Sequence, residues 1–281
     1  MITTKRSKLF SKIVTYIVLI AFAVLCIFPL LWMMATAIKP EDEIRTAIPT
    51  FVTLHPTFDN FSRVLMNNGF LLNIRNSLLV AVFTTIVSLV VSMFAAYTMS
   101  RYGKFKEIKL SGAAMLISQM VPGVLLLVPL FIIMKEINLI DTYLSLIIAY
   151  TTFSIPMCTF ILKGFYDTLP HDLEESAEID GCSKLGIIFK IIVPISIPSL
   201  ISTGLYAFVL AWNEFMFGYV FINSESIRTI TPAIKMFQGS NITDWGGLMA
   251  ASTLAVLPIT IVFLFFQKYF VSGLTAGSVK G

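Results

Sequence analysis

Acidic side chains gather in one short stretch of this 281-residue chain, between Lys163 and Lys190. The acids are Asp167, Asp172, Glu174, Glu175, Glu178 and Asp180. Asp172 and Glu175 have the spacing of a helix N-terminal capping pair, and acids in a first turn favour the helix dipole. We therefore predict a short helix from Leu173 to Asp180, which Gly181 ends in a left-handed conformation.

The same stretch continues into a second predicted helix. Ser183 can cap the segment 184–193, which Pro194 then breaks. Helical spacing places four residues of the first helix on one face: Leu173, Ser176, Ala177 and Asp180. One apolar anchor and two very small side chains suit the groove of another protein. The alternative is an acidic, solvated loop that only connects two helices.

Groups for catalysis or metal binding are few and far apart. Two histidines, His55 and His171, are the only ones, and the three cysteines have neither paired spacing nor a neighbouring histidine. The glycines between Gly273 and Gly281 lack the spacing of a phosphate-binding loop. We expect no catalytic residue and no metal site, and we predict that the chain is not an enzyme.

Glu214 is the only acid within the long apolar segments of the chain. An acid at the centre of a membrane helix carries an insertion cost of roughly 2.5–3.5 kcal/mol, so Glu214 is expected to face protein or water. Two interpretations stay open. Either the carboxylate pairs or reaches solvent near the membrane interface, or Asn213 and Glu214 line the outer part of a transport pathway or its gate.

The composition of the chain predicts which secondary-structure elements carry the residues discussed above. The chain is 57% hydrophobic and 13% charged, with a mean hydropathy of +0.86, which excludes a soluble enzyme, a nucleic-acid binder and a disordered chain. Backbone groups in lipid must be satisfied within each segment, so long apolar runs are helices. We predict an all-α fold, a single transmembrane domain over residues 1–281, with helices at about 13–37, 77–99, 110–134, 144–162, 195–221 and 248–266.

The charges between these helices predict their orientation. Most of the 20 Lys and Arg residues fall in the terminal segments and in the loops that share their side of the membrane. The bias puts both termini, and the loop 163–194, in the cytoplasm. A cleavable signal peptide ending near Ala37 is the alternative, but an apolar run of about 25 residues exceeds the 7 to 15 of such a signal. We expect an uncleaved first helix.

One outer loop is longer than a connection between two helices requires. It spans residues 223–247, and loops beyond about 12–15 residues are commonly functional or disordered. Its polar run contains Gln238, Gly239, Ser240, Asn241 and Asp244. The amides of Gln238 and Asn241 and the Asp244 carboxylate can bond sugar hydroxyls, while Trp245 can anchor the loop at the membrane interface. The alternative is a simple connector.

A stripe of small residues marks the second predicted helix. Four of them recur every four positions: Ser88, Ser92, Ala96 and Ser100. Such a stripe lets another helix approach closely, and packing is the interpretation we favour.

The acidic loop resembles the coupling loop of ABC importer permeases. That motif reads Glu-Ala-Ala, three residues, Gly, and then Ile-x-Leu-Pro, and it is matched here by Glu175, Gly181 and the run 191–194. Two positions depart from it, since Ser176 stands for the first alanine and Val193 for the leucine. The resemblance extends over nearly the whole chain and is closest to the carbohydrate importers of the maltose type, through the runs 139–142, 211–214 and 273–281.

The resemblance implies a function and a set of partners. In that family two homologous permease subunits form a heterodimer in the bacterial or archaeal cell (inner) membrane. Two ATPase subunits, which hold ATP and Mg²⁺, dock in the cytoplasm, and an extracellular solute-binding protein delivers sugar. The resemblance therefore implies a multi-pass sugar-importing permease subunit surrounded by the lipid bilayer, with no cofactor of its own and no nucleic-acid partner.

Three contact sites follow from the same resemblance. The coupling loop would contact the ATPase through Leu173, Glu175, Ser176, Ala177, Asp180 and Gly181. A carboxy-terminal tail with Thr275, Gly277, Lys280 and Gly281 would reach between the ATPase subunits. The outer loop 238–244 would enter the cleft of the binding protein.

Three other functions compete with sugar import by an ABC importer. A secondary transporter would need several acids within the membrane or repeated broken helices, and neither is visible. A membrane adaptor that only assembles other subunits is a second alternative. Within ABC importers, glycerol-phosphate is an alternative substrate to a sugar.

Overall fold

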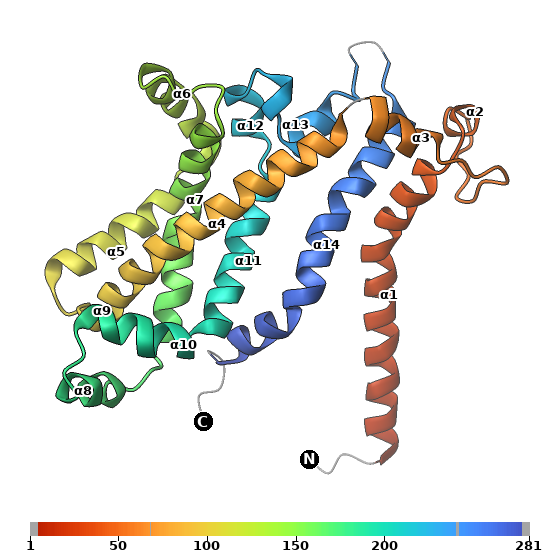
Figure 1. Ribbon diagram of the computed structural model, residues 1–281. Coiled ribbons are helices and arrows are strands. Elements are labelled where there is room, and N and C mark those ends of the chain that lie inside the picture. The colour runs from red at the N-terminus through yellow and green to blue at the C-terminus, as the bar shows by residue number, and fades with distance from the viewer. Residues whose placement is uncertain (1–4, 68, 240–241, 277–281) are drawn as a thin grey trace. The chain divides into compact units, whose positions relative to one another are not determined.

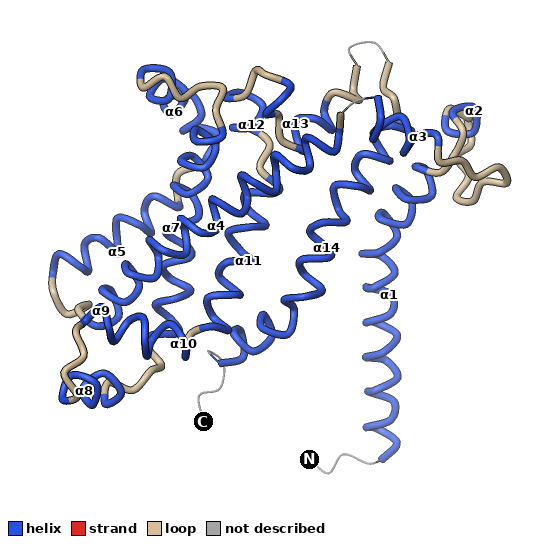
Figure 2. Tube along the Cα trace, viewed as in Figure 1, coloured by secondary structure: helices blue, strands red, loops and turns tan. Residues whose placement is uncertain are grey.

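A computed structural model describes residues 5–67, 69–239 and 242–276 of the chain. Within these residues the chain is helical and contains no strand, apart from one isolated antiparallel bridge between Gln238 and Thr243 (Figures 1 and 2). The predicted all-α class is confirmed. The chain divides into two compact units, 1–70 with 234–257 and 71–233 with 258–281.

The first unit contains the first membrane helix and the segment that follows it. Its elements are α1 (Lys5–Ala37), α2 (Glu41–Ile44), α3 (Asp59–Ser62), a π-helical turn (Arg63–Asn67) and the first part of α14 (Trp245–Ala276). Buried Lys39 joins the start of the segment after α1 to its middle, since its Nζ donates to the carbonyl oxygen of Thr50 and, at 3.2 Å, to the Thr50 hydroxyl. Asn60 donates to the carbonyl oxygens of Ala37 and Lys39 at 3.0 and 2.8 Å. These bonds give the outer segment after α1 a fixed fold.

The second unit contains the remaining helices. They are α4 (Phe70–Arg101), α5 (Lys106–Gln119), α6 (Leu127–Glu136), α7 (Tyr143–Tyr166), α8 (Asp172–Ile179), α9 (Lys184–Ile187), α10 (Val193–Ile195), α11 (Ile197–Asn213), α12 (Met216–Phe221) and α13 (Ile230–Lys235), together with the rest of α14. A π-helical turn (Ile188–Ile192) joins α9 to α10, and short 3-10 turns precede α6 (Gly123–Leu126) and α13 (Glu225–Ile227). Within this unit α8 lies at one end and α6 and α12 lie at the other (Figure 1).

The predicted stripe of small residues packs α4 against α7. The hydroxyls of Ser88 and Ser154 are 2.6 Å apart, and the Ser92 hydroxyl donates to the carbonyl oxygen of Ile155 at 3.1 Å. Ala96 is fully buried. Small side chains bring the two backbones close enough for these bonds, which satisfy hydroxyls away from water.

Four helices are each long and apolar enough to cross a membrane: Leu9–Ala37, Phe70–Arg101, Tyr143–Tyr166 and Trp245–Gln267. Two bent pairs pass the same test together, 106–119 with 123–136, bent by 96°, and 184–195 with 197–213, bent by 82°. The described residues thus contain four candidate spans, or up to six if each bent pair is one span. The last helix also extends beyond its predicted limits of 248–266, from Trp245 to Ala276.

Two of the predicted helices are interrupted. The segment 110–134 breaks between Gln119 and Gly123, where Pro122 offers no N–H to continue the helix. The segment 195–221 ends at Asn213 and begins again at Met216.

Pro194 does not break the helix that precedes it, contrary to the prediction. It directly follows the π-helical turn 188–192 and Val193, and the helical residues continue through it to Ile195. The bend comes two residues later at Ser196, whose hydroxyl donates to the carbonyl oxygen of Ile192 at 2.6 Å.

Candidate functional site

Helix α8 in the loop 163–194 begins at Asp172 and has no side-chain cap. The predicted capping pair of Asp172 and Glu175 is therefore wrong. His171 already has helical dihedral angles, φ −65° and ψ −30°, and its carbonyl oxygen accepts from Glu174 N and Glu175 N at 2.9 and 3.1 Å. Asp172 consequently lies inside the first turn, where it favours the helix dipole with two other acids.

The end of α8 follows the prediction. Gly181 has a φ of +80°, and the Cys182 N–H donates to the carbonyl oxygen of Ala177 at 2.9 Å. This is the glycine-ended pattern that satisfies the last carbonyl groups of a helix. Ser183 then caps α9, since its hydroxyl accepts from Gly186 N at 3.2 Å. The loop is a compact helix, turn and helix.

The residues predicted to contact an ATPase separate into two sets. Five are exposed: Leu173, Glu175, Ser176, Asp180 and Gly181. Ala177 is only 6% exposed and packs in a cluster with Tyr97 of α4 and Leu162 of α7. The predicted four-residue face is thus corrected, because Ala177 attaches α8 to its own chain and leaves the other three residues of that face outward.

Glu174 is a site residue that the sequence analysis missed. Its carboxylate accepts from Arg101 Nε at 2.5 Å and from the Tyr97 hydroxyl at 2.6 Å, and both charged side chains are under 10% exposed. Tyr97 and Arg101 are four residues apart on α4 and so share one face. That spacing, at the end of an apolar helix, was the available signal.

Arg101 also binds the chain that leaves α7. It donates to the carbonyl oxygens of Tyr166 at 2.9 Å and Leu169 at 3.4 Å. Next to it, Asp167 accepts from the Ser100 hydroxyl at 2.7 Å and from Lys163 Nζ at 2.6 Å. Burial acts to raise the pKa of the Asp167 carboxyl, but the bonds to Lys163 and Ser100 outweigh it and hold the pKa below its ordinary value.

Glu214 lies at the break between α11 and α12. Its two carboxylate oxygens accept from the backbone N–H groups of Phe217 and Gly218 at 3.0 and 3.1 Å. Thr231 donates from its hydroxyl to the Glu214 carbonyl oxygen. The carboxylate thus satisfies N–H groups that the first turn of α12 leaves unpaired, which explains how one acid is accommodated in an apolar segment. Asn213, beside it, is exposed.

A second carboxylate joins the loop before α7 to the loop after α12 in the same unit. Asp141, which has a φ of +63°, accepts from the backbone N–H groups of Asn223 and Ser224, both at 2.9 Å, and from the Ser224 hydroxyl. The bonds from Ser224, and then that from Asn223, hold the pKa of Asp141 below its ordinary value. Thr142, next to it, caps α7.

The structure describes only some of the residues that were predicted to form the outer-loop site. Gln238 pairs with Thr243 across the loop, and Gln238 Oε1 accepts from Lys235 Nζ at 2.6 Å. Asp244 accepts from Gly247 N at 2.9 Å and from Arg63 at 3.1 Å. The Asp244 carboxylate therefore already holds the start of α14. Ser240 and Asn241 lie outside the described residues.

The predicted tail is also covered only in part. Thr275 belongs to α14, which runs to Ala276. Gly277, Lys280 and Gly281 lie outside the described residues.

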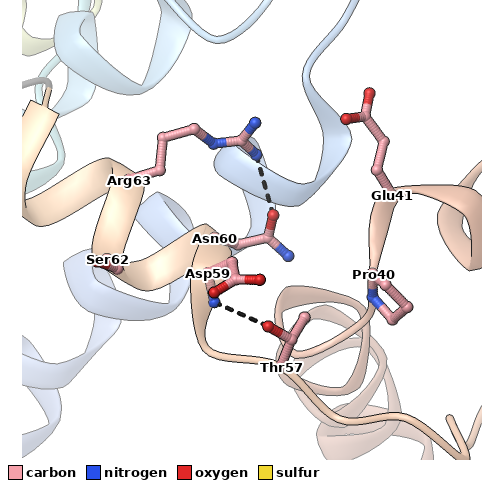
Figure 3. Close-up of a pocket in the computed structure, with 7 residues that line it drawn as sticks. All are labelled: Pro40, Glu41, Thr57, Asp59, Asn60, Ser62 and Arg63. Atoms are coloured by element: carbon pink, nitrogen blue, oxygen red, sulfur yellow. Dashed lines mark hydrogen bonds between the residues drawn. The ribbon is translucent and has the colours of Figure 1, made fainter.

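A polar pocket of about 390 Å³ in the first unit did not emerge from the sequence. It is lined by Pro40, Glu41, Thr57, Asp59, Asn60, Ser62 and Arg63 (Figure 3). Arg63 donates to Asn60 Oδ1 at 2.9 Å, and Asp59 N donates to the Thr57 hydroxyl at 3.1 Å (Figure 3). These lining groups come from the ends of one outer segment, and their bonds contribute to its fold.

Long apolar helices, with a helix–turn–helix loop between them, are the features of a polytopic membrane protein. Over residues 88–276 the chain matches the family described as the binding-protein-dependent transport system inner membrane component, and it belongs to this family. It is thus a transport component of an inner membrane rather than an enzyme, as predicted. Membership does not favour the secondary-transporter alternative.

Similar proteins cover nearly the whole chain. The trehalose/maltose transport system permease protein of Thermococcus litoralis is 36% identical, over 98% of this chain and 99% of that protein. The sulfoquinovosyl glycerol transport system permease protein of Agrobacterium fabrum is also 36% identical, over 91% of this chain and 89% of that protein. A bacterial ABC transporter that imports alginate has a TM-score of 0.80 at 19% identity, covering 96% of this chain and 99% of that chain, and shows the same fold.

Proposed function

We propose that the chain is a permease subunit of an ATP-driven sugar importer. The support is that relatives named for sugar transport match it almost from end to end at 36% identity. The glycerol-phosphate alternative has no such support among these relatives. The chain would form the translocation pathway with a second, homologous permease subunit, in a bacterial or archaeal cell membrane with both termini in the cytoplasm.

The coupling of this permease to ATP would occur at α8. The observation that carries the proposal is that this helix is attached on one side only, because Glu174 and Ala177 are buried while Leu173, Ser176 and Asp180 are exposed. An ATPase subunit would dock on the outward side. ATP and Mg²⁺ would bind to the two ATPase subunits and not to this chain.

The outer face would meet a solute-binding protein. The described ends of the loop 238–244 support this proposal, because Gln238 pairs with Thr243 and Asp244 accepts from Gly247 N. Asn213 and Glu214 would line the outer part of the pathway or its gate, at a place where the helix is already broken.

Reconstitution into proteoliposomes tests the proposal. The complex is purified with its second permease subunit, the ATPase subunits and the binding protein, and uptake of radiolabelled trehalose, maltose, diacetylchitobiose and glycerol 3-phosphate is measured. We expect uptake of a sugar that requires internal ATP. Uptake driven by an ion gradient without ATP would indicate a secondary transporter, and assembly of the complex without uptake of any of these compounds would indicate an adaptor.

A further inference from the structure

The ion pair between Arg101 and Glu174 is buried at the place where the cytoplasmic loop meets the membrane helices. The two side chains are 6% and 8% exposed, and Nε lies 2.5 Å from Oε1. The other ion pair of this loop, between Lys184 and Glu178, is exposed at 57% and 44%. Burial of two charges carries a desolvation penalty that solvated charges do not have, so a buried pair is weak evidence for stability and fits a role in fixing one arrangement.

The hydrogen bonds around the pair show which elements are fixed. Glu174 comes from α8, Arg101 and Tyr97 come from α4, and the carbonyl oxygens of Tyr166 and Leu169 come from the end of α7 and the turn after it. One guanidinium therefore binds three consecutive parts of the unit. A planar guanidinium with five donors can do this, whereas a lysine ammonium cannot reproduce the same fork.

Apolar packing next to the pair reinforces the same attachment. Ala177, one turn after Glu174, lies in a buried cluster with Tyr97, Leu162 and Tyr166. Outward residues of α8 make no comparable contact, and Ile179 is 87% exposed. The helix is thus held to the membrane helices along one line, through Glu174 and Ala177.

We propose that Arg101 is a positioning residue that makes α8 move as one body with α4 and α7, so that force from the ATPase enters the membrane helices through Glu174. This inference rests on the proposed function, in which an ATPase docks on α8. It assigns transmission to the buried Glu174 and docking to the exposed residues around Glu175. Loss of the Arg101–Glu174 pair would separate docking from transmission: the ATPase would still bind, but its movement would not reach α4 and α7.

Hydrogen–deuterium exchange of the assembled complex measures both steps, because local amide exchange reports local opening. The complex is compared without nucleotide and after trapping with Mg-ATP and vanadate. Peptides over residues 172–179 report docking, and peptides over residues 89–101 and 150–166 report transmission. In the unaltered complex we expect a nucleotide-dependent change in all three regions.

Variants then separate the steps. Glu174→Gln is expected to keep the nucleotide-dependent change over 172–179 and to lose it over 89–101 and 150–166. Arg101→Lys should retain part of the nucleotide-dependent change over 89–101 and 150–166, because the positive charge is kept. Tyr97→Phe, which removes one hydrogen bond to Glu174, should lose an intermediate part of that change. Lys184→Gln removes the exposed pair of the same loop from the α9 side, without altering α8, and is the matched control, expected to behave as the unaltered complex.

The outcomes that overturn the inference are distinct from those that overturn the proposed function. A full nucleotide-dependent change over 89–101 and 150–166 in Glu174→Gln would overturn the transmission role, and so would loss of ATPase binding in that variant. If Glu174→Gln does not accumulate, Tyr97→Phe decides, and an unaltered response in it would count against the role. If adding the ATPase subunits to the permease pair gave no added protection over 172–179, that result would instead contradict ATPase docking on α8.

Discussion

Gly181 is the residue at which local backbone chemistry matters most. Its φ of +80° is disfavoured for every residue with a Cβ, by roughly 1–2 kcal/mol, although a Cβ there would meet no atom within 4 Å of the chain. We expect Gly181→Ala to lower the stability of the loop by about 1 kcal/mol and Gly181→Arg also to reduce ATPase association, since its bulk would project toward the docking side. Co-purification of the ATPase and sugar uptake measure the two effects.

Gly164→Ala is the matched control for these variants. Gly164 also has open space around it, but it lies within α7 and has no positive φ, so alanine should be tolerated there. Normal ATPase association and normal uptake by Gly181→Arg would contradict the assignment of the coupling loop.

Asp141 supplies a pH-dependent contact between the loop before α7 and the loop after α12. Its pKa in the folded chain is lowered, so its contribution to stability is present above the ordinary pKa of about 4 and is lost as the pH falls through the lower folded value. We expect Asp141→Asn to lower the thermal stability at neutral pH and to show a smaller decrease on acidification below about pH 4. Melting curves of the purified complex between neutral and acidic pH measure this, and equal acid sensitivity in both proteins would contradict it.

At the scale of elements, the break between α11 and α12 depends on one carboxylate. Glu214→Gln retains one acceptor and loses the second, so we expect a loss of about 1 kcal/mol in stability together with lower sugar uptake, because the gate would be less well fixed. Uptake is normalised to the amount of assembled complex. If uptake and assembly were unchanged and only the stability fell, Glu214 would have no role in transport and would serve only to bond the first turn of α12.

The loop between α13 and α14 can be shortened while the side-chain bonds of Gln238 and Asp244 at its two ends are kept, although the pairing of Gln238 with Thr243 is lost. Replacement of residues 239–243 by a shorter Gly-Ser linker leaves Gln238 and Asp244 in place, and with them the bonds from Lys235, Gly247 and Arg63. We expect reduced sugar uptake, because the contact with the binding protein would be lost, while the sugar affinity of the isolated binding protein remains unchanged. Undiminished uptake at normal expression would show that the loop is only a connector.

At the scale of the whole molecule, the carboxy-terminal tail tests the assembly. We expect deletion of residues 275–281 to reduce ATPase docking and turnover in the complex, since the tail is proposed to lie between the ATPase subunits. A shorter deletion, of residues 277–281, leaves α14 complete to Ala276 and separates the loss of the tail from the loss of the last helical residues. If both deletions left ATPase docking and turnover unchanged, the proposed contact between the tail and the ATPase subunits would be ruled out.

Much of this protein follows from its sequence alone. Apolar runs between charges predicted the all-α class, and the spacing of Gly181 and Ser183 predicted how α8 ends and how α9 begins. These features depend on the solvent and on neighbours within a few residues along the chain, so the local sequence contains the necessary information. The motif around Glu175 also predicted the family before any fold was known.

Other features depend on residues far apart in the sequence, and only the tertiary structure decided them. Glu174 and Glu175 are adjacent acids, yet Glu174 is buried because Arg101 and Tyr97 lie 73 and 77 positions away and face it, while Glu175 is exposed. The partner of Asp141 is likewise 83 residues away. Burial and pairing are properties of packed helices, and no local pattern specifies which helix will lie beside another.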